Sequence, residues 1–482
     1  MEARRVISRI EAGNVEIPAG KRVPKGWKAR ALVPHGEDIF LGWSPVQGQG
    51  PSRLRLTVAI DIREEMMIEV KLAQSGELLG HLDVRYANVF QPHELSLTEP
   101  QTDAVMKEGV SLRLVKGSVP FWFLISAEPH LVAGGELLLP HLMFEQAVQG
   151  DSLENFYATM ASISSIHPFG WMEGCVLDGL LDLAETTGQE SYRTAATAHL
   201  QVFLDKQERL TYENPRSEPM DDEIYGMEGT LPFAAIARLR GRHPLVEQAL
   251  HFWYGTRDEE GNILDGTMLS AEGSYTVAYP MAVSAQWYGV EWRKLAVQQL
   301  TLRSRKLVQD DGLYLRLEQD GSRSFKDWAR AHAWHLLGLV RTMNVLGQAQ
   351  DTAVLEAELN RSLNVVMSRQ REDGLWGVFL DDPGSVPDTS GSAGIAAAAA
   401  MAIAGGWYSL EDPSALIRTK ESLIRYLTPD GILTGVAQGN KGGMELQTGS
   451  YRVMSQMGMG LFAQLLSALS RVEELPAGNV MR

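Results

Sequence analysis

The sequence contains one cysteine, Cys175, among its 482 residues. A single thiol excludes an internal disulfide and also a zinc site built on several thiolates. Basic residues are outnumbered as well, because 44 Lys and Arg face 60 Asp and Glu, which gives a formal net charge of −16. This negative charge disfavours nonspecific binding to nucleic acid, whose phosphates it would repel. We therefore expect no nucleic-acid partner.

Long apolar runs are absent too. The longest, residues 394–407, spans about 14 residues, short of the roughly 20 that cross a bilayer. Its Ala and Gly content favours a tightly packed core helix. Residues 1–20 lack the apolar stretch of a signal peptide. The sequence thus predicts a cytoplasmic protein with no membrane partner.

Familiar catalytic motifs are missing. The sequence has no GxGxxG, GxxxxGK[ST], HExxH, GxSxG or EF-hand loop. Nucleotide-binding, zinc-protease and serine-hydrolase functions therefore lack support. We expect no cofactor and no bound metal. What remains near the predicted helix starts is carboxylates, aromatic rings, an arginine and a few histidines, an inventory typical of carbohydrate-active sites.

The hydrophobic pattern changes near residue 150. Before it, short runs rich in Val, Ile and aromatic residues alternate apolar with polar positions and are separated by turns. After it, apolar residues recur at helical spacing. We predict an N-terminal antiparallel β-sandwich domain over residues 1–150 and a mainly α-helical catalytic domain over residues 151–482.

The helical part is internally repetitive. Acidic-Gly turns recur between its units, at residues 260–263, 311–314, 373–376 and 430–433. Six helical hairpins that cannot bury their apolar faces alone would close into a toroid, the (α/α)6 barrel. The predicted starts of its inner helices are near Trp171, Glu228, Tyr275, Trp334, Gly391 and Tyr451.

Acidic residues stand at two of these helix starts. Asp221 and Asp222 precede the second inner helix, Glu228 lies on its first turn, and Glu272 precedes the third. Glycosidic cleavage needs one carboxyl group that stays protonated and often a second as base or nucleophile. Because these acids stand at the rim where the active sites of such barrels lie, we expect them to take part in catalysis. The alternative is that these acids are helix caps or solvated surface charges.

A second group surrounds Arg330, whose planar fork suits a carboxylate and lies between Trp328 and Trp334. A structural ion pair is the alternative for Arg330, and a helix cap is the alternative for Asp388. The candidates for substrate binding are Trp171, Glu228, Tyr275, Trp328, Arg330, His332, Trp334, Trp376, Asp388, Tyr451 and Arg452.

Residues 155–470 resemble the unsaturated glucuronyl and rhamnogalacturonyl hydrolases of glycoside hydrolase families 88 and 105. Residues 328–334 are similar to the family motif W-x-R-G-[NQ]-x-W, and residues 373–393 to D-G-L-W…L-D-x-P…E-x-S-x-S-A. Residues 180–192 resemble the TGD-x-x-Y element. Residues 221–224 resemble N-[IV]-D-D-I, which carries one functional acid, and residues 272–280 resemble D-G-L-Y-M-A-x-P, which carries the principal acid. The resemblance therefore implies that Glu272 is the proton donor, with Asp222 as its partner and Asp221 as the nearest rival.

The resemblance implies an exo-acting glycoside hydrolase that removes a terminal uronic acid from acidic oligosaccharides. The chain departs from the family pattern at Glu272, which replaces an Asp, at His332, which replaces Asn or Gln, and at Gly377, which replaces His. The β domain is also additional to the minimal enzyme. Related barrels with such a domain include β-uronidases of glycoside hydrolase family 154 and some polysaccharide lyases.

Other functions remain open at this point. A lyase or epimerase on the same barrel would need a base for the C5 proton, for which Tyr275, His332 and Tyr451 are candidates. A carbohydrate-binding protein without activity is a third possibility, although the retained acids argue against it. A homo-oligomer is also left open.

Overall fold

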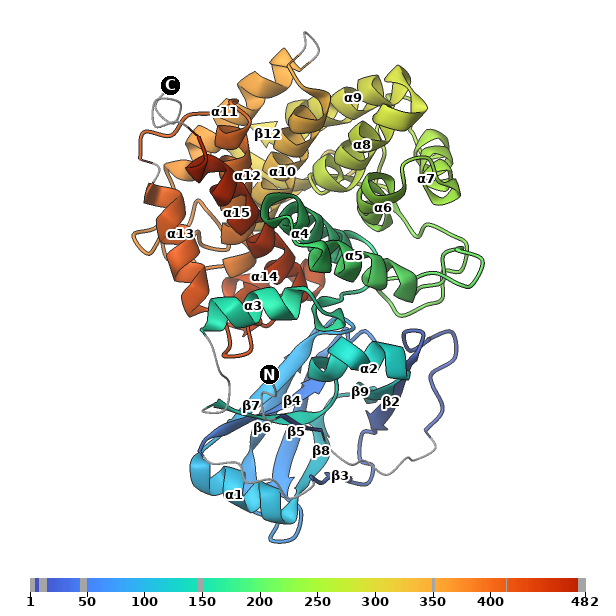
Figure 1. Ribbon diagram of the computed structural model, residues 1–482, viewed down its shortest axis with the longest axis vertical. Coiled ribbons are helices and arrows are strands. Elements are labelled where there is room, and N and C mark those ends of the chain that lie inside the picture. Colours follow the sequence, from blue (N-terminus) through green and yellow to red (C-terminus); the bar gives the residue numbers. More distant parts are fainter. Residues whose placement is uncertain are drawn as a thin grey trace.

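The computed structural model describes residues 5–7, 15–43, 50–145, 151–348, 352–412 and 414–475 (Figure 1). Its N-terminal part consists of strands with two short helices. The strands are β1 (Arg5–Ile7), β2 (Trp27–Leu32), β3 (Ile39–Leu41), β4 (Ser52–Thr57), β5 (Glu65–Leu72), β6 (Leu78–Arg85), β7 (Pro92–Leu97), β8 (Val110–Lys116), β9 (Phe121–Ala127) and β10 (His141–Phe144). The helices are α1 (Glu99–Glu108) and α2 (Pro129–Gly135).

These strands form antiparallel sheets, as predicted. One four-stranded sheet has the order β1-β10-β4-β7, another has the order β3-β8-β5-β6, and β2 pairs with β9. Strand β5 shows why the sheet forms, because its residues alternate between buried and partly buried along its whole length. Apolar residues of the three sheets share one cluster, which includes Leu54, Ile68 and Phe123. The predicted change near residue 150 falls at residues 146–150, outside the described part of the chain.

The remainder is mainly helical. Six inner helices contact one another in sequence order, and the last returns to the first, so the ring closes. They are α4 (Trp171–Thr187), α6 (Pro232–Arg240), α8 (Tyr279–Tyr288), α10 (Ala329–Leu346), α12 (Thr389–Ala404) and α15 (Gln456–Glu473). Their small residues permit close approach; for example, a Cβ on Gly460 would lie 2.5 Å from the carbonyl oxygen of Cys175.

Each inner helix has an outer partner, which completes the predicted (α/α)6 barrel (Figure 1). The outer helices are α5 (Glu190–Val202), α7 (Pro244–Gly255), α9 (Val290–Leu307), α11 (Ala353–Met367) and α13 (Ser414–Arg425), while α3 (Ser152–Met160) packs on α15. The predicted inner-helix starts agree with the observed ones to within a few residues. In the part of the chain that is described, no helix is both long and apolar enough to cross a membrane.

The loops that lead into the inner helices form one rim and carry short elements. They are β11 (Leu269–Ser270), β12 (Val308–Gln309), β13 (Gly312–Leu317), β14 (Arg323–Lys326), β15 (Val436–Ala437), α14 (Gly443–Thr448) and β16 (Arg452–Val453). The predicted acidic-Gly turns lie here. At one of them Gly431 has φ +85°, and a Cβ there would lie 2.2 Å from the backbone nitrogen of Phe156. Only glycine fits this contact.

The β sheets dock on this rim (Figure 1). Arg55 of β4 is fully buried and donates to the carboxylate of Asp430 at 2.7 Å, and Lys441 pairs with Asp61. A charge buried without its partner is strongly destabilising, so these pairs favour one fixed docking position. The end of the barrel that carries the inner-helix starts is therefore partly covered by the N-terminal part.

Candidate active site

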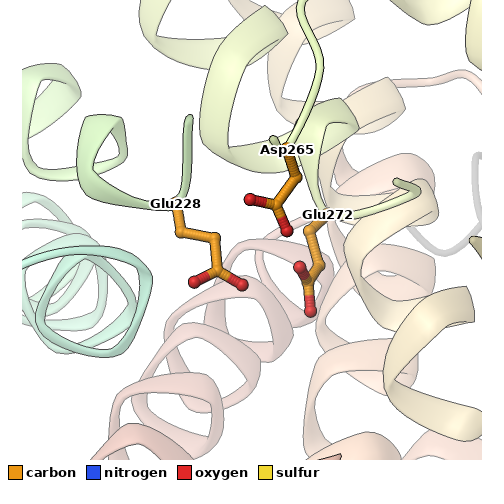
Figure 2. Close-up of side chains that lie close together, drawn as sticks. All are labelled: Glu228, Asp265 and Glu272. Atoms are coloured by element: carbon orange, nitrogen blue, oxygen red, sulfur yellow. The ribbon is translucent and has the colours of Figure 1, made fainter. Parts of the chain in front are cut away.

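Three carboxyl groups converge at the rim, those of Glu228, Asp265 and Glu272 (Figure 2). Their side chains each offer an oxygen, and these oxygens all lie within 4.8 Å of one another. Glu228 belongs to a short 3-10 turn before α6, Asp265 to the loop after α7, and Glu272 to the turn between β11 and α8. Glu272 is buried and the other two are partly buried. Three acids from separate elements thus meet at the predicted end of the barrel.

Local hydrogen bonds set the direction of two of these acids. The hydroxyl of Ser270 donates to Oε2 of Glu272 at 3.3 Å and accepts from the Glu272 backbone N–H at 3.1 Å. Asp265 opens a tight turn in which its backbone N–H donates to the carbonyl of Met268 at 2.8 Å. Gly266, with φ +59°, supplies the left-handed backbone that this turn needs. Both carboxyl groups are therefore held by the backbone that precedes α8.

Arg303 of α9 supports this backbone from beneath. Its Nε donates to the Ser270 carbonyl at 3.0 Å and its Nη2 to the Ile263 carbonyl at 2.7 Å. A Cβ on Gly273 would lie 2.2 Å from Nη2, so glycine is required where the chain crosses the guanidinium. Burial lowers the pKa of Arg303 to about 9. Arg303 ties together the two ends of the segment that carries Asp265.

Burial and mutual repulsion retain protons on the acid cluster. Loss of solvent raises the pKa of Glu228 well above its usual range, and the negative charges of Glu272 and Asp265 raise it further. Burial and the charge of Glu272 raise the pKa of Asp265 to about 6, against a partial offset by Arg316. Glu228 therefore keeps its proton to a higher pH than an ordinary carboxyl group, while Asp265 is mostly ionised near neutral pH. That is the division of roles that acid/base chemistry needs.

Of the predicted acids, the structure brings together Glu272 and Glu228. Glu228 had been assigned to substrate binding, but it is the member whose carboxyl group is held protonated. Asp265 was not among the predicted residues. Its one signal in the sequence is the turn-forming pair Asp265-Gly266, which resembles the other acidic-Gly turns.

Asp222, the expected partner of Glu272, and Asp221, the nearest rival, are not members of this cluster. The carboxylate of Asp221 accepts two hydrogen bonds of 2.8 Å from Arg22, and its side chain is 56% exposed. Asp222 has φ +61°, lies 3.4 Å from Arg209 and is 53% exposed. Both lie on the surface loop that meets the N-terminal part, and the hydrogen bonds from Arg22 lower the pKa of Asp221.

Arg330 does not present an open fork. Its Nη1 donates to the carbonyl of Ala437 and its Nη2 to that of Gln438 at 2.7 Å, and the side chain is 1% exposed. The guanidinium packs 4.4 Å from the centre of the Trp328 ring. These contacts are those of a structural residue. They leave the two terminal nitrogens of Arg330 occupied, which argues against the expected direct hydrogen bonds to a substrate carboxylate.

Most of the predicted aromatic contacts are packed inside the protein. Trp328 donates to Gln447 and Trp376 donates to the Val366 carbonyl, and both are buried. Trp334 stacks on Tyr275 at 6.1 Å, and the Tyr275 hydroxyl donates to Asp178 at 2.6 Å. Trp171, which is partly buried, meets Trp334 edge-on at 5.5 Å. Among these five rings, Trp171 alone keeps part of its surface open.

The remaining predicted contacts are also bonded within the chain. Nε2 of His332 lies 3.0 Å from Asp327, and Asp388 caps α12 by accepting from the Ser390 backbone N–H. Tyr451 donates to the Asp83 carbonyl at 3.1 Å, and Arg452 donates to the Pro387 carbonyl at 2.9 Å. The structure assigns these four to capping and to packing at the rim. Asp388 is therefore a helix cap, which was the alternative to substrate binding that the sequence offered.

The acid cluster is also the one group of three or more His, Cys, Asp or Glu, within the described ranges, that is close enough to hold a metal ion. Oxygen ligands of this kind suit Ca²⁺ or Mg²⁺. A carboxyl group that retains its proton is a poor ligand, because metal binding must displace that proton. The raised pKa of Glu228 therefore favours proton chemistry over cation binding.

A cavity of about 400 Å³ lies at the opposite mouth of the barrel. It is lined by residues near the C-terminal ends of the inner helices, including Asp182, Arg238 and Arg341. These three pair with one another, since Arg238 donates to Asp182 at 3.0 Å and Arg341 donates to the same carboxylate. This network is separate from the acid cluster, and within it Nε of Arg341 is buried without a partner among the described residues.

Comparison with known proteins places the chain near one group of enzymes. The sequence model of Glycosyl Hydrolase Family 88 matches residues 288–473. The unsaturated rhamnogalacturonyl hydrolase YesR of Bacillus subtilis (strain 168) is 33% identical over 72 residues, which is 15% of this chain and 21% of that protein. The match thus spans about a fifth of the relative's length. The resemblance inferred from the motifs is confirmed.

Solved structures share the fold at low identity. A glycoside hydrolase of family 105 from C. acetobutylicum ATCC 824 superposes with a TM-score of 0.57 at 18% identity, covering 67% of this chain and 98% of its own. A possible family 105 member from Salmonella enterica gives 0.54 at 17%, covering 65% and 84%. A polysaccharide lyase gives 0.52 at 15%, covering 64% and 92%. This architecture therefore occurs in glycoside hydrolase family 105 and also in a polysaccharide lyase.

Proposed function

We propose that this protein is an exo-acting glycoside hydrolase that releases a terminal uronic acid, unsaturated or saturated, from acidic oligosaccharides. The observation that carries the proposal is the cluster of Glu228, Asp265 and Glu272, in which one carboxyl group stays protonated beside an ionised one. The match to Glycosyl Hydrolase Family 88 and the local likeness to an unsaturated rhamnogalacturonyl hydrolase support it.

In this proposal Glu228 and Glu272 act together to deliver the catalytic proton. The charge of Glu272 and a hydrogen bond between the two side chains favour the protonated form of Glu228. The donor is therefore the Glu228–Glu272 pair, in which Glu228 carries the proton. Glu272 thus keeps the catalytic place expected from the sequence, and Asp265 replaces Asp222 as the base.

On an unsaturated uronide, the pair protonates C4 of the vinyl ether and leaves positive charge at C5. Water then adds to C5 while Asp265 accepts its proton, and the C5 hemiketal opens to a ketone. The hemiacetal that remains at C1 then breaks down to an aldehyde and releases the remaining sugar. On a saturated uronide, the pair would protonate the glycosidic oxygen. Carboxylates that lie about 5 Å apart are typical of enzymes that retain configuration, so Asp265 would then act as nucleophile.

We further propose that the antiparallel sheets of residues 1–150 form a β-sandwich domain and that residues 151–482 form the catalytic domain. The buried pair Arg55–Asp430 and the ion pair Arg22–Asp221 support a role in covering part of the rim that carries the acid cluster. A cytoplasmic location, where small imported oligosaccharides would be the substrates, belongs to the same proposal. Cell fractionation tests that location.

The second candidate function is a lyase, because a polysaccharide lyase shares the fold. A lyase needs a free base near C5, and the three residues considered for that task, Tyr275, His332 and Tyr451, are bonded to other residues of the chain. The hydrolase is therefore favoured.

The test is a screen of unsaturated and saturated uronic-acid oligosaccharides with product identification by mass spectrometry. A hydrolase acting on an unsaturated uronide removes absorbance near 230 nm, as is known for this chromophore, whereas a lyase creates it. Mass spectrometry shows whether a single terminal sugar is released. Activity on neutral oligosaccharides alone would overturn the proposal.

A further inference from the structure

A second arginine, Arg316, points toward the acid cluster from the neighbouring hairpin. It lies on β13, directly opposite Ser270 of β11 in an antiparallel pair. Residues that stand opposite in such a pair project from the same face of the sheet with their Cβ atoms about 5 Å apart. The Ser270 hydroxyl bonds to the Glu272 carboxylate. Arg316 is therefore on the face that meets the catalytic carboxyl groups.

The electrostatic coupling between these groups agrees with that placement. The positive charge of Arg316 lowers the pKa values of Glu228 and Asp265 and so opposes the effect of burial on both. Arg316 is thus close enough to influence two members of the cluster. It is nevertheless not salt-bridged to either one, since no carboxylate oxygen in the described ranges is within 4.0 Å of its nitrogens.

The guanidinium of Arg316 is free for a ligand. Throughout the described part of the chain its side-chain nitrogens donate to no acceptor, and Nε is buried without a partner. The contrast is with Arg330, whose two terminal nitrogens are occupied by backbone carbonyls. A fork that is held near the catalytic acids but unpaired is suited to bind a planar carboxylate with two hydrogen bonds.

Aromatic packing holds Arg316 in place without using its hydrogen-bond donors. Its guanidinium carbon lies 5.4 Å from the centre of the Phe325 ring, and Phe325 lies 6.0 Å from Trp328. Phe325 lies on β14, the strand that pairs with β13. Its φ of +53° is an uncommon conformation for an aromatic residue. Stacking of this kind leaves the edge of the guanidinium open.

We propose that Arg316, rather than Arg330, binds the carboxylate of the uronic acid and so determines the specificity of the site for acidic sugars. The inference rests on the proposed function and adds the residue that recognises the acidic group. It places the C5 carboxylate of the substrate beside Ser270 and the acid cluster. The bond at C4–C5 or at C1 would then lie within reach of the Glu228–Glu272 pair.

The experiment compares binding of charged sugars and their neutral counterparts. Glucuronate and galacturonate, with glucose and galactose as controls, are titrated calorimetrically into the full-length protein and into three variants. The variants are Arg316→Gln, Arg316→Lys and Arg323→Gln. Arg323 lies on β14 of the same hairpin and is exposed, so its variant removes an equal charge away from the cluster. Circular dichroism confirms that each variant folds.

Arg316→Gln is expected to weaken uronate binding by about 10- to 100-fold, the loss typical of a hydrogen-bonded charge, and to leave neutral-sugar binding unchanged. Arg316→Lys keeps the charge but loses the fork and should fall between parent and Arg316→Gln. Arg323→Gln should match the parent. A structural role for Arg316 would instead weaken both kinds of sugar equally.

Two results would overturn the inference. They are equal binding of charged and neutral sugars by the parent, or retained uronate preference in Arg316→Gln. Failure of the proposed function looks different. In that case the parent binds uronate through Arg316 but releases no uronic acid from any oligosaccharide.

Discussion

Carboxyl oxygens of Glu228 and Glu272 lie within 4.8 Å of each other, although one residue precedes α6 and the other precedes α8 (Figure 2). Two like charges at this separation cannot both be maintained at low cost in a site with little solvent. The proton that they retain is the basis of the predictions that follow.

Replacing Glu228 by Gln preserves its shape and removes its proton. General acid catalysis typically contributes about 10²–10⁴ in rate, and we expect kcat to fall by that amount. The measurement is kcat for Glu228→Gln on whichever uronide the parent cleaves, with Glu223→Gln as the matched control, because Glu223 is an exposed glutamate in the preceding loop. A Glu228→Gln enzyme within about threefold of the parent would remove Glu228 from the mechanism.

The pH dependence should show the titration of Asp265. Burial and the charge of Glu272 raise its pKa to about 6, and a base must be ionised to accept a proton. The value of kcat/KM should therefore rise as the pH increases through about 6 and level off above it. An acidic limb near 4, the ordinary range of an exposed carboxyl group, would argue against Asp265 as the base.

The same raised pKa has a consequence for stability. Between the pKa of an unfolded Asp, about 3.9, and the folded value of about 6, the native state binds more protons than the unfolded state. The contribution of Asp265 therefore makes the protein less stable as the pH rises from about 4 to about 6. Asp265→Asn should flatten this part of the pH–stability curve in denaturant titrations. An unchanged slope would show that Asp265 does not titrate in this range.

Asp222 provides a direct comparison with the pairing expected from the motifs. Because its side chain is 53% exposed and its partner Arg209 is at the surface, Asp222→Asn should keep kcat within about threefold of the parent. A loss of about 10²-fold or more in a folded variant would return the catalytic role to Asp222.

The backbone at Gly273 should not tolerate a side chain. A Cβ there would lie 2.2 Å from Nη2 of Arg303, so Gly273→Ala must shift the guanidinium or the turn that carries Glu272. We expect a destabilisation of about 1–3 kcal/mol, seen as a lower Tm, together with a loss of kcat. Gly255→Ala is the matched control, because nothing lies within 4 Å of that position. Equal Tm values for the two variants would contradict the close contact.

Metal removal tests the alternative use of the acid cluster. Since Glu228 holds a proton that a metal would have to displace, activity should survive dialysis against EDTA unchanged. Loss of activity that Ca²⁺ or Mg²⁺ restores would show that the three carboxyl groups bind a cation.

Hydrophobic periodicity carried enough information to predict much of the fold, because inner helices such as α10 and α12 bury nearly all of their length and strand β5 alternates between buried and partly buried residues. The site was only partly predictable. Glu228 and Glu272 could be found because acids at the start of a buried inner helix are unusual. Asp221 and Asp222 give the same signal, although both side chains are exposed and Asp221 pairs with Arg22, which is distant in sequence.

Asp265 and Arg316 could not be found in this way. Asp265 lies in a loop whose path is fixed by Arg303 on another helix, and no local pattern encodes that contact. Arg316 is one of many arginines until its strand register places it opposite Ser270. Arg330 was easier to notice because two indoles flank it, yet its donors are taken by Ala437 and Gln438.

The most direct test of the proposed activity follows absorbance near 230 nm while the protein acts on unsaturated uronyl disaccharides, with the products identified by mass spectrometry. The account predicts that absorbance falls as a terminal uronic acid is released, and that Glu228→Gln nearly abolishes the change. Rising absorbance on saturated polyuronides would identify a lyase instead. Absence of any uronic acid release, from unsaturated and saturated substrates alike, would contradict the central claim.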